Sequence, residues 1–180
     1  MNWLKSFWQF SRPHTIIGTS LSVLALYFIS LATTATKINP VNLEQMIAVW
    51  VACLCGNIYI VGLNQLYDIE IDRVNKPELP LASGEFTVGQ GKLIVGVTGC
   101  LSLIIAALSG TWLFATVTTS LLIGTAYSTP PIRLKQFPFW AAFCILTVRG
   151  VIVNIGLFLH YGDKLNGQEV LNPYVWTLTL

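Results

Sequence analysis

The chain has 180 residues, of which 54% are hydrophobic and only 10% are charged, and its net charge is +2. Soluble globular domains average about 25% charged residues. The composition therefore excludes an ordinary soluble domain and indicates an integral membrane protein in a lipid bilayer. The small net charge argues against a nucleic-acid partner. The four cysteines lie in apolar runs and show neither the spacing of a zinc site nor a secreted disulfide framework.

The N-terminal segment "MNWLKSFWQFSRPHT" lacks the basic region, short apolar core and cleavage site of a signal peptide. It also lacks the Arg- and Ser-rich character of an organelle transit peptide. We therefore expect a bacterial protein, or one that has already been processed. The aromatic residues before the first apolar run are typical of an interface belt or an in-plane helix.

Charge-free apolar stretches predict the membrane spans, because a helical span needs about 20 mostly apolar residues. The first two stretches are 14–36 and 45–67. Residues 93–132 are too long for one span, and Ser109 and Gly110 predict a turn that divides them. A fifth span, 137–161, contains Arg149, and 172–180 opens a sixth. We therefore expect an all-α integral membrane bundle with five complete transmembrane helices and the start of a sixth.

The basic residues predict the orientation of these spans. With the N-terminus in the cytoplasm, seven Lys and Arg residues lie inside, Lys37 and Lys164 lie outside, and Arg149 lies within a span. The positive-inside rule favours this arrangement. It places residues 62–85 and the segment "YSTPPIRLKQFP" on the same cytoplasmic face.

An acidic constellation follows the second predicted span. Asn64, Asp68 and Asp72 are spaced i, i+4 and i+8, which on a continuous helix aligns them on one face. Oxygen donors of this kind suit Mg²⁺, which commonly pairs one or two carboxylates with substrate phosphates. The alternative is a set of ordinary solvated residues at a helix end. The amide of Gln65 one turn deeper and the nearby Lys76 favour a metal–phosphate site.

The segment "NQLYDIEIDRVNKPELPLASGEF" resembles the first aspartate-rich motif of the UbiA-type intramembrane prenyltransferases. Within that superfamily it is similar to the homogentisate prenyltransferases, the phytyl- and solanesyltransferases of tocopherol and plastoquinone biosynthesis. "RPHTIIGTSLS", "AYSTPPIRLKQFP" and "VRGVIVNIG" resemble the same group, so the similarity covers essentially the whole chain.

The resemblance implies a bundle of about nine transmembrane helices around a central cavity that opens sideways to lipid. It implies Mg²⁺-dependent transfer of a prenyl group from a prenyl diphosphate to homogentisate, with loss of the acceptor's carboxyl group as CO₂. It also implies a plasma or thylakoid membrane of a cyanobacterium-like bacterium, with the active-site face in the cytoplasm. The length of the prenyl chain does not follow from it.

The resemblance assigns roles to individual residues. Asn64, Asp68 and Asp72 hold Mg²⁺, and the two aspartates are catalytic together with Arg149. An arginine in mid-span usually faces a cavity or a partner, so Arg149 binds the homogentisate carboxylate or the diphosphate, or else forms a buried structural ion pair. Arg12 competes for the carboxylate, or acts as an interfacial anchor. The substrate-binding candidates are Lys76, Arg133, Lys135, Tyr127, Ser128, Arg12 and Asn154; for Arg133 and Lys135 the alternative is positive-inside anchoring.

The second aspartate-rich motif of the family has no counterpart in the 180 residues. We therefore expect 1–180 to be a single incomplete prenyltransferase domain, the N-terminal portion, with little activity alone and possible pairing with a C-terminal half. One alternative is a non-catalytic membrane fragment or subunit that binds prenyl diphosphate. Others are a UbiA-type enzyme with another acceptor, such as 4-hydroxybenzoate, and a transporter-like protein.

Overall fold

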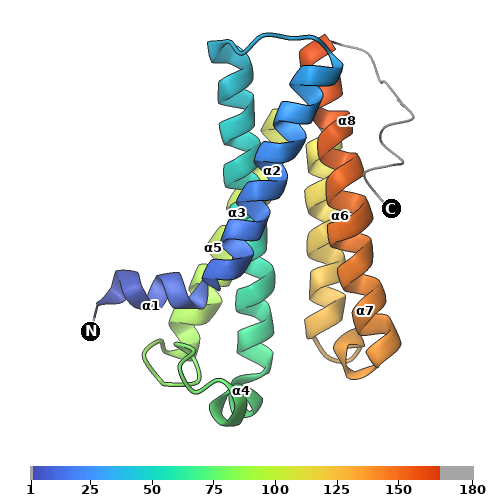
Figure 1. Cartoon of the computed structure of the whole chain (residues 1–180). Coiled ribbons are helices and arrows are strands. Elements are labelled where there is room, and N and C mark those ends of the chain that lie inside the picture. Colours follow the sequence, from blue (N-terminus) through green and yellow to red (C-terminus); the bar gives the residue numbers. More distant parts are fainter. Residues whose placement is uncertain (1, 167–180) are drawn as a thin grey trace.

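The computed structural model describes residues 2–166, which form helices joined by loops (Figure 1). Within this part of the chain, four helices are long and apolar enough to cross a membrane. They are α2 (Pro13–Thr33), α3 (Pro40–Tyr67), α5 (Val88–Ser109) and a continuous helix over Pro138–Leu165. The last combines α7 (Pro138–Leu146), a π-helical segment (Thr147–Ile152) and α8 (Val153–Asn166). The predicted all-α membrane fold is confirmed.

The fourth predicted span forms a helix that is less apolar than we expect of a membrane span. It forms helix α6 (Thr111–Ser128), but this helix is not among the four that are apolar enough to cross on composition alone. Seven of its 18 residues are Ser or Thr. Several of these hydroxyls bond to carbonyls of the preceding turn, as Thr116 does to Trp112 at 2.7 Å, so the helix satisfies part of its polar groups internally. The sixth predicted span, from residue 172, lies outside the described residues.

The turn predicted at Ser109 and Gly110 is confirmed. Gly110 ends α5 and begins α6 with a φ of 147°, a backbone conformation that favours glycine. A Cβ at this position would also lie 3.2 Å from the side chain of Lys164, so the turn packs closely on α8.

Helix α3 begins at Pro40, five residues before the predicted boundary at 45, because its start is capped. The Asn39 side chain accepts the backbone N–H of Asn42 at 2.9 Å, and the Asn42 side chain accepts the backbone N–H of Asn39 at 3.0 Å. This reciprocal capping box satisfies two backbone donors, and proline is favoured at the first helical position. Thr87 and Gln90 cap α5 in the same way.

Small residues let the helices of the bundle approach closely, as is common between membrane helices. A Cβ on Gly99 would lie 2.6 Å from the ring of Tyr59, which joins α5 to α3. A Cβ on Gly124 would lie 2.7 Å from Ile60, which joins α6 to α3. Helix α3 therefore contacts both α5 and α6 closely, and these contacts fix one wall of the space described below.

Helix α1 (Trp3–Phe10) lies across one end of the bundle, as Figure 1 shows. Its inner side packs on the loop that follows α4 (Ile69–Asn75), where the rings of Phe10 and Phe86 are 5.8 Å apart. The hydroxyl of Ser6 donates to Glu85 Oε2 at 2.5 Å. Its tryptophans remain about half exposed. The arrangement agrees with the predicted in-plane helix, and it ties the loop 76–87 to the N-terminal segment.

Candidate functional site

The predicted acidic motif lies where α3 ends, at the same end of the bundle as α1, α4 and the loop between α6 and α7 (Figure 1). Asp68 ends α3 and precedes α4 with φ −117° and ψ 17°, so it is not part of a continuous helix. The predicted straight stripe of Asn64, Asp68 and Asp72 is therefore wrong in its local geometry. The physical reason is that the Asp68 amide bonds to the Gln65 carbonyl at 3.3 Å, a tightened last turn that ends α3.

Two basic side chains from the loop 129–137 hold the Asp68 carboxylate. Arg133 Nη2 lies 2.9 Å from Oδ1, and Lys135 Nζ lies 2.5 Å from Oδ2. Lys135 Nζ also donates to Asn64 Oδ1 at 2.8 Å. Ser128, which is fully buried, donates to the same amide oxygen at 3.4 Å. Residues 62–85 and the segment "YSTPPIRLKQFP" thus lie together, as the sequence predicted.

Asp72 has a different environment from Asp68. Only 4% of its surface is exposed, and its Oδ2 has no hydrogen-bond partner within residues 2–166. Burial raises the pKa of Asp72, while the positive charges of Lys76 and Arg12 oppose the rise. A buried acceptor without a partner costs about 1–3 kcal/mol, and more when it is charged. Asp72 is therefore a site at which a bound cation would replace a missing interaction.

Arg12, whose charge acts on Asp72, and Arg133, which pairs with Asp68, each carry a donor without a partner among residues 2–166. Arg12 Nη2 and Arg133 Nε are buried and have no partner in the described part of the chain. Both residues have left-handed backbone conformations, with φ of 53° for Arg12 and 38° for Arg133. Such strain in residues other than glycine often accompanies function. The site thus presents free donors and a free acceptor together, which suits a ligand that combines an anion with a cation.

A cavity of about 680 Å³ opens beside this cluster, between α2, α3, α6 and the α7–α8 helix. Small-molecule sites commonly have volumes of about 300–1,000 Å³. Arg12, Asn64 and Tyr127 line it next to the acidic cluster, and Cys53 and Val153 line it deeper in the bundle.

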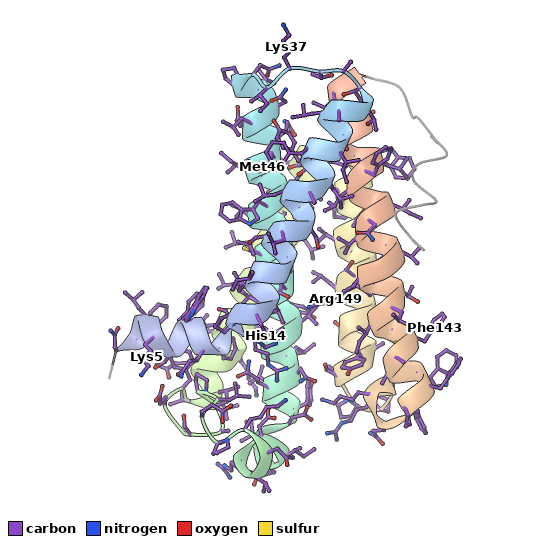
Figure 2. The ribbon with its side chains drawn as sticks, viewed as in Figure 1. Lys5, His14, Lys37, Met46, Phe143 and Arg149 are labelled. Atoms are coloured by element: carbon purple, nitrogen blue, oxygen red, sulfur yellow. The ribbon has the colours of Figure 1, made fainter. Side chains whose placement is uncertain are left out.

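Arg149 enters the cavity from the π-helical segment. Figure 2 shows it in the space between α2 and the α7–α8 helix, and a Cβ on Gly18 of α2 would lie 3.9 Å from its Nη1. Among the described residues it has neither an ion pair nor a hydrogen bond, so the alternative of a structural ion pair finds no support there. Single-turn π segments are frequent at functional sites, where they re-aim a side chain.

Seven predicted residues are not in the lining of the cavity: Asp68, Asp72, Lys76, Ser128, Arg133, Lys135 and Asn154. Lys76 is exposed at the end of α4, where its charge acts on Asp72 but its side chain is not part of the lining. Asn154 is also absent from the lining, and its Nδ2 donates to the Gly150 carbonyl of its own helix at 3.0 Å.

Asn57 is a cavity residue that the sequence analysis missed. Its Nδ2 donates to Thr15 Oγ1 at 2.9 Å, which links α3 to α2 at the cavity wall. Asn57 lies seven residues before Asn64, and this spacing places both on one face of a helix. The signal was present in the sequence as a polar residue in the middle of an apolar run.

The donor set for a metal is small. In residues 2–166, no group of three or more His, Cys, Asp and Glu side chains is placed to hold an ion. The available oxygens are two carboxylates, Asp68 and Asp72, and the amide of Asn64. These are hard donors of the kind that Mg²⁺ prefers, and the buried oxygen of Asp72, which has no partner among the described residues, fits such an ion.

The fold and the site define an all-helical membrane protein with a cavity in its bundle and a charged cluster at the cavity mouth. The chain belongs to the UbiA prenyltransferase family, which matches residues 22–180.

Curated proteins with similar sequences are homogentisate phytyltransferases. The homogentisate phytyltransferase of Synechocystis is 54% identical over 178 residues, which cover 98% of this chain and 58% of that protein. The chloroplastic homogentisate phytyltransferase 1 of Arabidopsis thaliana is 46% identical over 171 residues, or 93% of this chain and 43% of that protein. The chain thus spans about half the length of these curated relatives.

Solved structures show the same fold. A UbiA homolog from Archaeoglobus fulgidus, bound to DMAPP and Mg²⁺, matches with a TM-score of 0.72 and 21% identity, over 97% of this chain and 59% of that one. A structure described for digeranylgeranylglyceryl phosphate synthase matches with a TM-score of 0.76 and 21% identity, over 99% of this chain and 58% of that one.

Proposed function

We propose that the chain acts in the transfer of a prenyl group from a prenyl diphosphate to homogentisate, with decarboxylation of the acceptor, in tocopherol- or plastoquinone-type biosynthesis. The observation that carries the proposal is the joint position of Asp68, Asp72 and two buried cationic atoms, which have no partner among the described residues, beside a cavity of the helical bundle. The homogentisate phytyltransferases among its relatives support the choice of acceptor.

Asn64, Asp68 and Asp72 are the residues that would hold Mg²⁺. When bound, the ion would supply charge neutralisation for the diphosphate, as metal ions do at phosphoryl oxygens. The solved family structure with DMAPP and Mg²⁺ supports this role for the family. In this chain the unpartnered Asp72 Oδ2 supports it.

The basic residues of the mouth bind the diphosphate directly in this proposal. Within the described part of the chain, Arg12 and Arg133 each retain a buried donor without a partner, and Lys135 donates to both Asp68 and Asn64. As the allylic C–O bond breaks, its electron pair goes to the diphosphate, and fixed donors stabilise that charge as it develops. Tyr127, Ser128 and the more exposed Lys76 complete the set of proposed contacts.

Arg149 binds the carboxylate of the aromatic acid in this proposal. Burial raises the pKa of Asp72 and the charge of Arg12 opposes that rise, so Arg12 belongs with the acidic cluster at the mouth. Arg149 has no acidic partner among the described residues and lies deeper, against Gly18. The acceptor ring held by Arg149 then attacks the allylic carbon and loses its ring proton. Loss of CO₂ from the carboxylate leaves the electron pair of the broken C–C bond on the methylene carbon, which takes up one proton and becomes a methyl group. Asn154 stays a predicted substrate contact; its Nδ2 donates to the Gly150 carbonyl of its own helix.

The orientation and the membrane belong to the same proposal. The positive-inside distribution puts the mouth in the cytoplasm, and the cyanobacterial relative favours a plasma or thylakoid membrane. A complementary C-terminal half is proposed as the partner. The expectation that the 180-residue chain alone turns over little substrate stays a prediction.

Calorimetric titration tests the proposal. The full chain in lipid nanodiscs is titrated with geranylgeranyl diphosphate, with and without Mg²⁺. We expect Mg²⁺-dependent binding that Asp68→Asn weakens about tenfold or more, since a hydrogen bond to a charged group is worth about 1.5–3 kcal/mol. Asp163→Asn, at the opposite end of α8, serves as the control and should bind like the wild type.

Diphosphate binding that does not depend on Mg²⁺ would contradict the proposal. So would an equal loss of affinity in Asp68→Asn and Asp163→Asn. Adding homogentisate and measuring prenylated product in the same preparation then tests turnover of this chain. Replacing homogentisate by 4-hydroxybenzoate tests the alternative acceptor.

A further inference from the structure

Helices α1 and α2 meet at a sharp corner, as Figure 1 shows. Arg12 lies at this corner, directly before Pro13 of α2, and it lines the cavity. Its backbone has a φ of 53°. This left-handed conformation is costly for a residue with a Cβ, and such a conformation persists only where the surrounding structure holds it. The contacts on either side of Arg12 therefore indicate what keeps it at the cavity.

The first contact lies before Arg12, at the end of α1. Gln65 of α3 is 1% exposed, and its Nε2 donates to the Phe10 carbonyl at 2.8 Å. The Phe10 ring is fully buried and packs directly on α3, since a Cβ on Gly62 would lie 2.7 Å from its Cζ. A buried carbonyl that loses its partner is costly, so the hydrogen bond from Gln65 fixes the end of α1 to α3.

The second contact lies after Arg12, in the first turn of α2. Asn57 of α3 donates through its Nδ2 to Thr15 Oγ1 at 2.9 Å. The Thr15 hydroxyl donates in turn to the Arg12 carbonyl at 2.8 Å. Asn57 and Gln65 are eight residues apart on the same helix, which is about two helical turns. Two amides of α3 therefore hold the corner on both sides of Arg12.

We propose that Gln65, and Asn57 through Thr15, are positioning residues that hold the Arg12 guanidinium at the mouth of the cavity. Arg12 forms no ion pair among the described residues, and its Nη2 is buried there without a partner. Its side chain is therefore placed by the backbone of the corner, which the two amides fix. The inference rests on the proposed function, in which Arg12 contacts the diphosphate.

Helix α3 also sets the position of Arg12 relative to the acidic cluster. Gln65 directly follows Asn64, and neighbouring residues of a helix point about 100° apart. Asn64 accepts from Lys135 and Ser128, whereas Gln65 donates to the corner. One turn of α3 thus joins the cationic corner to a proposed metal ligand. A change at Gln65 should move Arg12 without removing any side chain of the acidic cluster.

A double-mutant cycle on the full chain in nanodiscs tests this inference. Calorimetry measures the affinity for geranylgeranyl diphosphate with Mg²⁺ present. Gln65→Met keeps a long side chain without an N–H donor and should weaken binding about three- to tenfold, the range for one hydrogen bond. Thr15→Val, which removes the hydroxyl that donates to the Arg12 carbonyl, should act in the same direction. Gln45→Met makes the same substitution about 30 Å away on α3 and should bind like the wild type.

The Arg12→Met background separates positioning from a general loss of structure. Adding Gln65→Met to Arg12→Met should change the affinity less than about twofold, because residues that act as a unit are not additive. An equal effect of Gln65→Met in both backgrounds would overturn the inference alone. So would wild-type affinity in both Gln65→Met and Thr15→Val. If the wild type binds no diphosphate, or Arg12→Met binds it equally well, the proposed diphosphate contact fails and the inference fails with it.

Discussion

Asp72→Asn should stabilise the ligand-free protein and impair ligand binding. In the wild type the buried carboxylate has one oxygen without a hydrogen-bond partner among the described residues, and its pKa is raised by burial. Asparagine keeps the shape and removes the charge. An unsatisfied buried acceptor costs about 1–3 kcal/mol, and the nearby cations recover part of that cost, so we expect a gain of about 1 kcal/mol. For a chain of this size, that gain raises Tm by roughly 2–4 °C.

The pH dependence gives the same prediction a second readout. Because the pKa of Asp72 is raised in the folded state, the folded protein binds more protons than the unfolded chain above about pH 4. Its stability therefore falls as the pH rises from the unfolded pKa through the folded pKa, and the loss is complete above the latter. Asp72→Asn removes this contribution and should flatten the slope in that window.

Thermal unfolding in nanodiscs, with and without ligand, measures both effects. Mg²⁺ and geranylgeranyl diphosphate together should raise the Tm of the wild type, because a ligand that binds only the folded state stabilises it by mass action. The same ligands should raise the Tm of Asp72→Asn much less. The reasoning is refuted if ligand-free Asp72→Asn is less stable than the wild type at neutral pH, or if both proteins gain equally from the ligands.

Three further predictions concern other parts of the structure. Arg149→Met should weaken homogentisate binding about tenfold or more while Arg149→Lys retains part of it, and calorimetry should show diphosphate binding unchanged; equal loss of both ligands would contradict the assignment. Gly99→Ala should cost about 1–3 kcal/mol by overpacking against α3, whereas Gly96→Ala, with nothing within 4 Å, should not lower Tm. Ser6→Ala removes the donor to Glu85 and should speed proteolysis of the loop 76–87; an unchanged cleavage rate would show that aromatic packing alone holds the loop.

Much of the fold follows from local sequence patterns. Charge-free apolar runs place α2, α3 and α5 within a few residues of their observed bounds, because burial of backbone groups in a bilayer permits few structures other than helices. Gly110 marks the α5–α6 turn because its backbone has a positive φ that glycine adopts without strain. Helix α6 is the exception. Its serines and threonines lower its mean hydropathy, so composition alone does not mark it as a membrane span, although it packs in the same bundle.

The candidate site is predicted only in part by sequence. Asn64, Asp68 and Asp72 stand out through their spacing, and Arg149 stands out because a lone charge in an apolar run is costly. The break of the helix at Asp68 was not predictable from spacing, since it depends on where the last turn of α3 tightens. Asn57 was missed because a single amide in an apolar run becomes meaningful only when a cavity lies beside it.

By itself, the sequence determined that the chain is a membrane-embedded helical bundle of the UbiA type, with an acidic motif after its second span and basic residues mostly on one side. Only the tertiary structure decided which charges meet. It paired Asp68 with Arg133 and Lys135 across more than 60 residues of chain, and it left Asp72 buried with an unpartnered oxygen. It also gathered Tyr27, Val49, Leu113 and Leu157 from four helices into one buried cluster. The physical reason is that periodicity fixes the face on which a residue lies, whereas its partners depend on how separate helices pack.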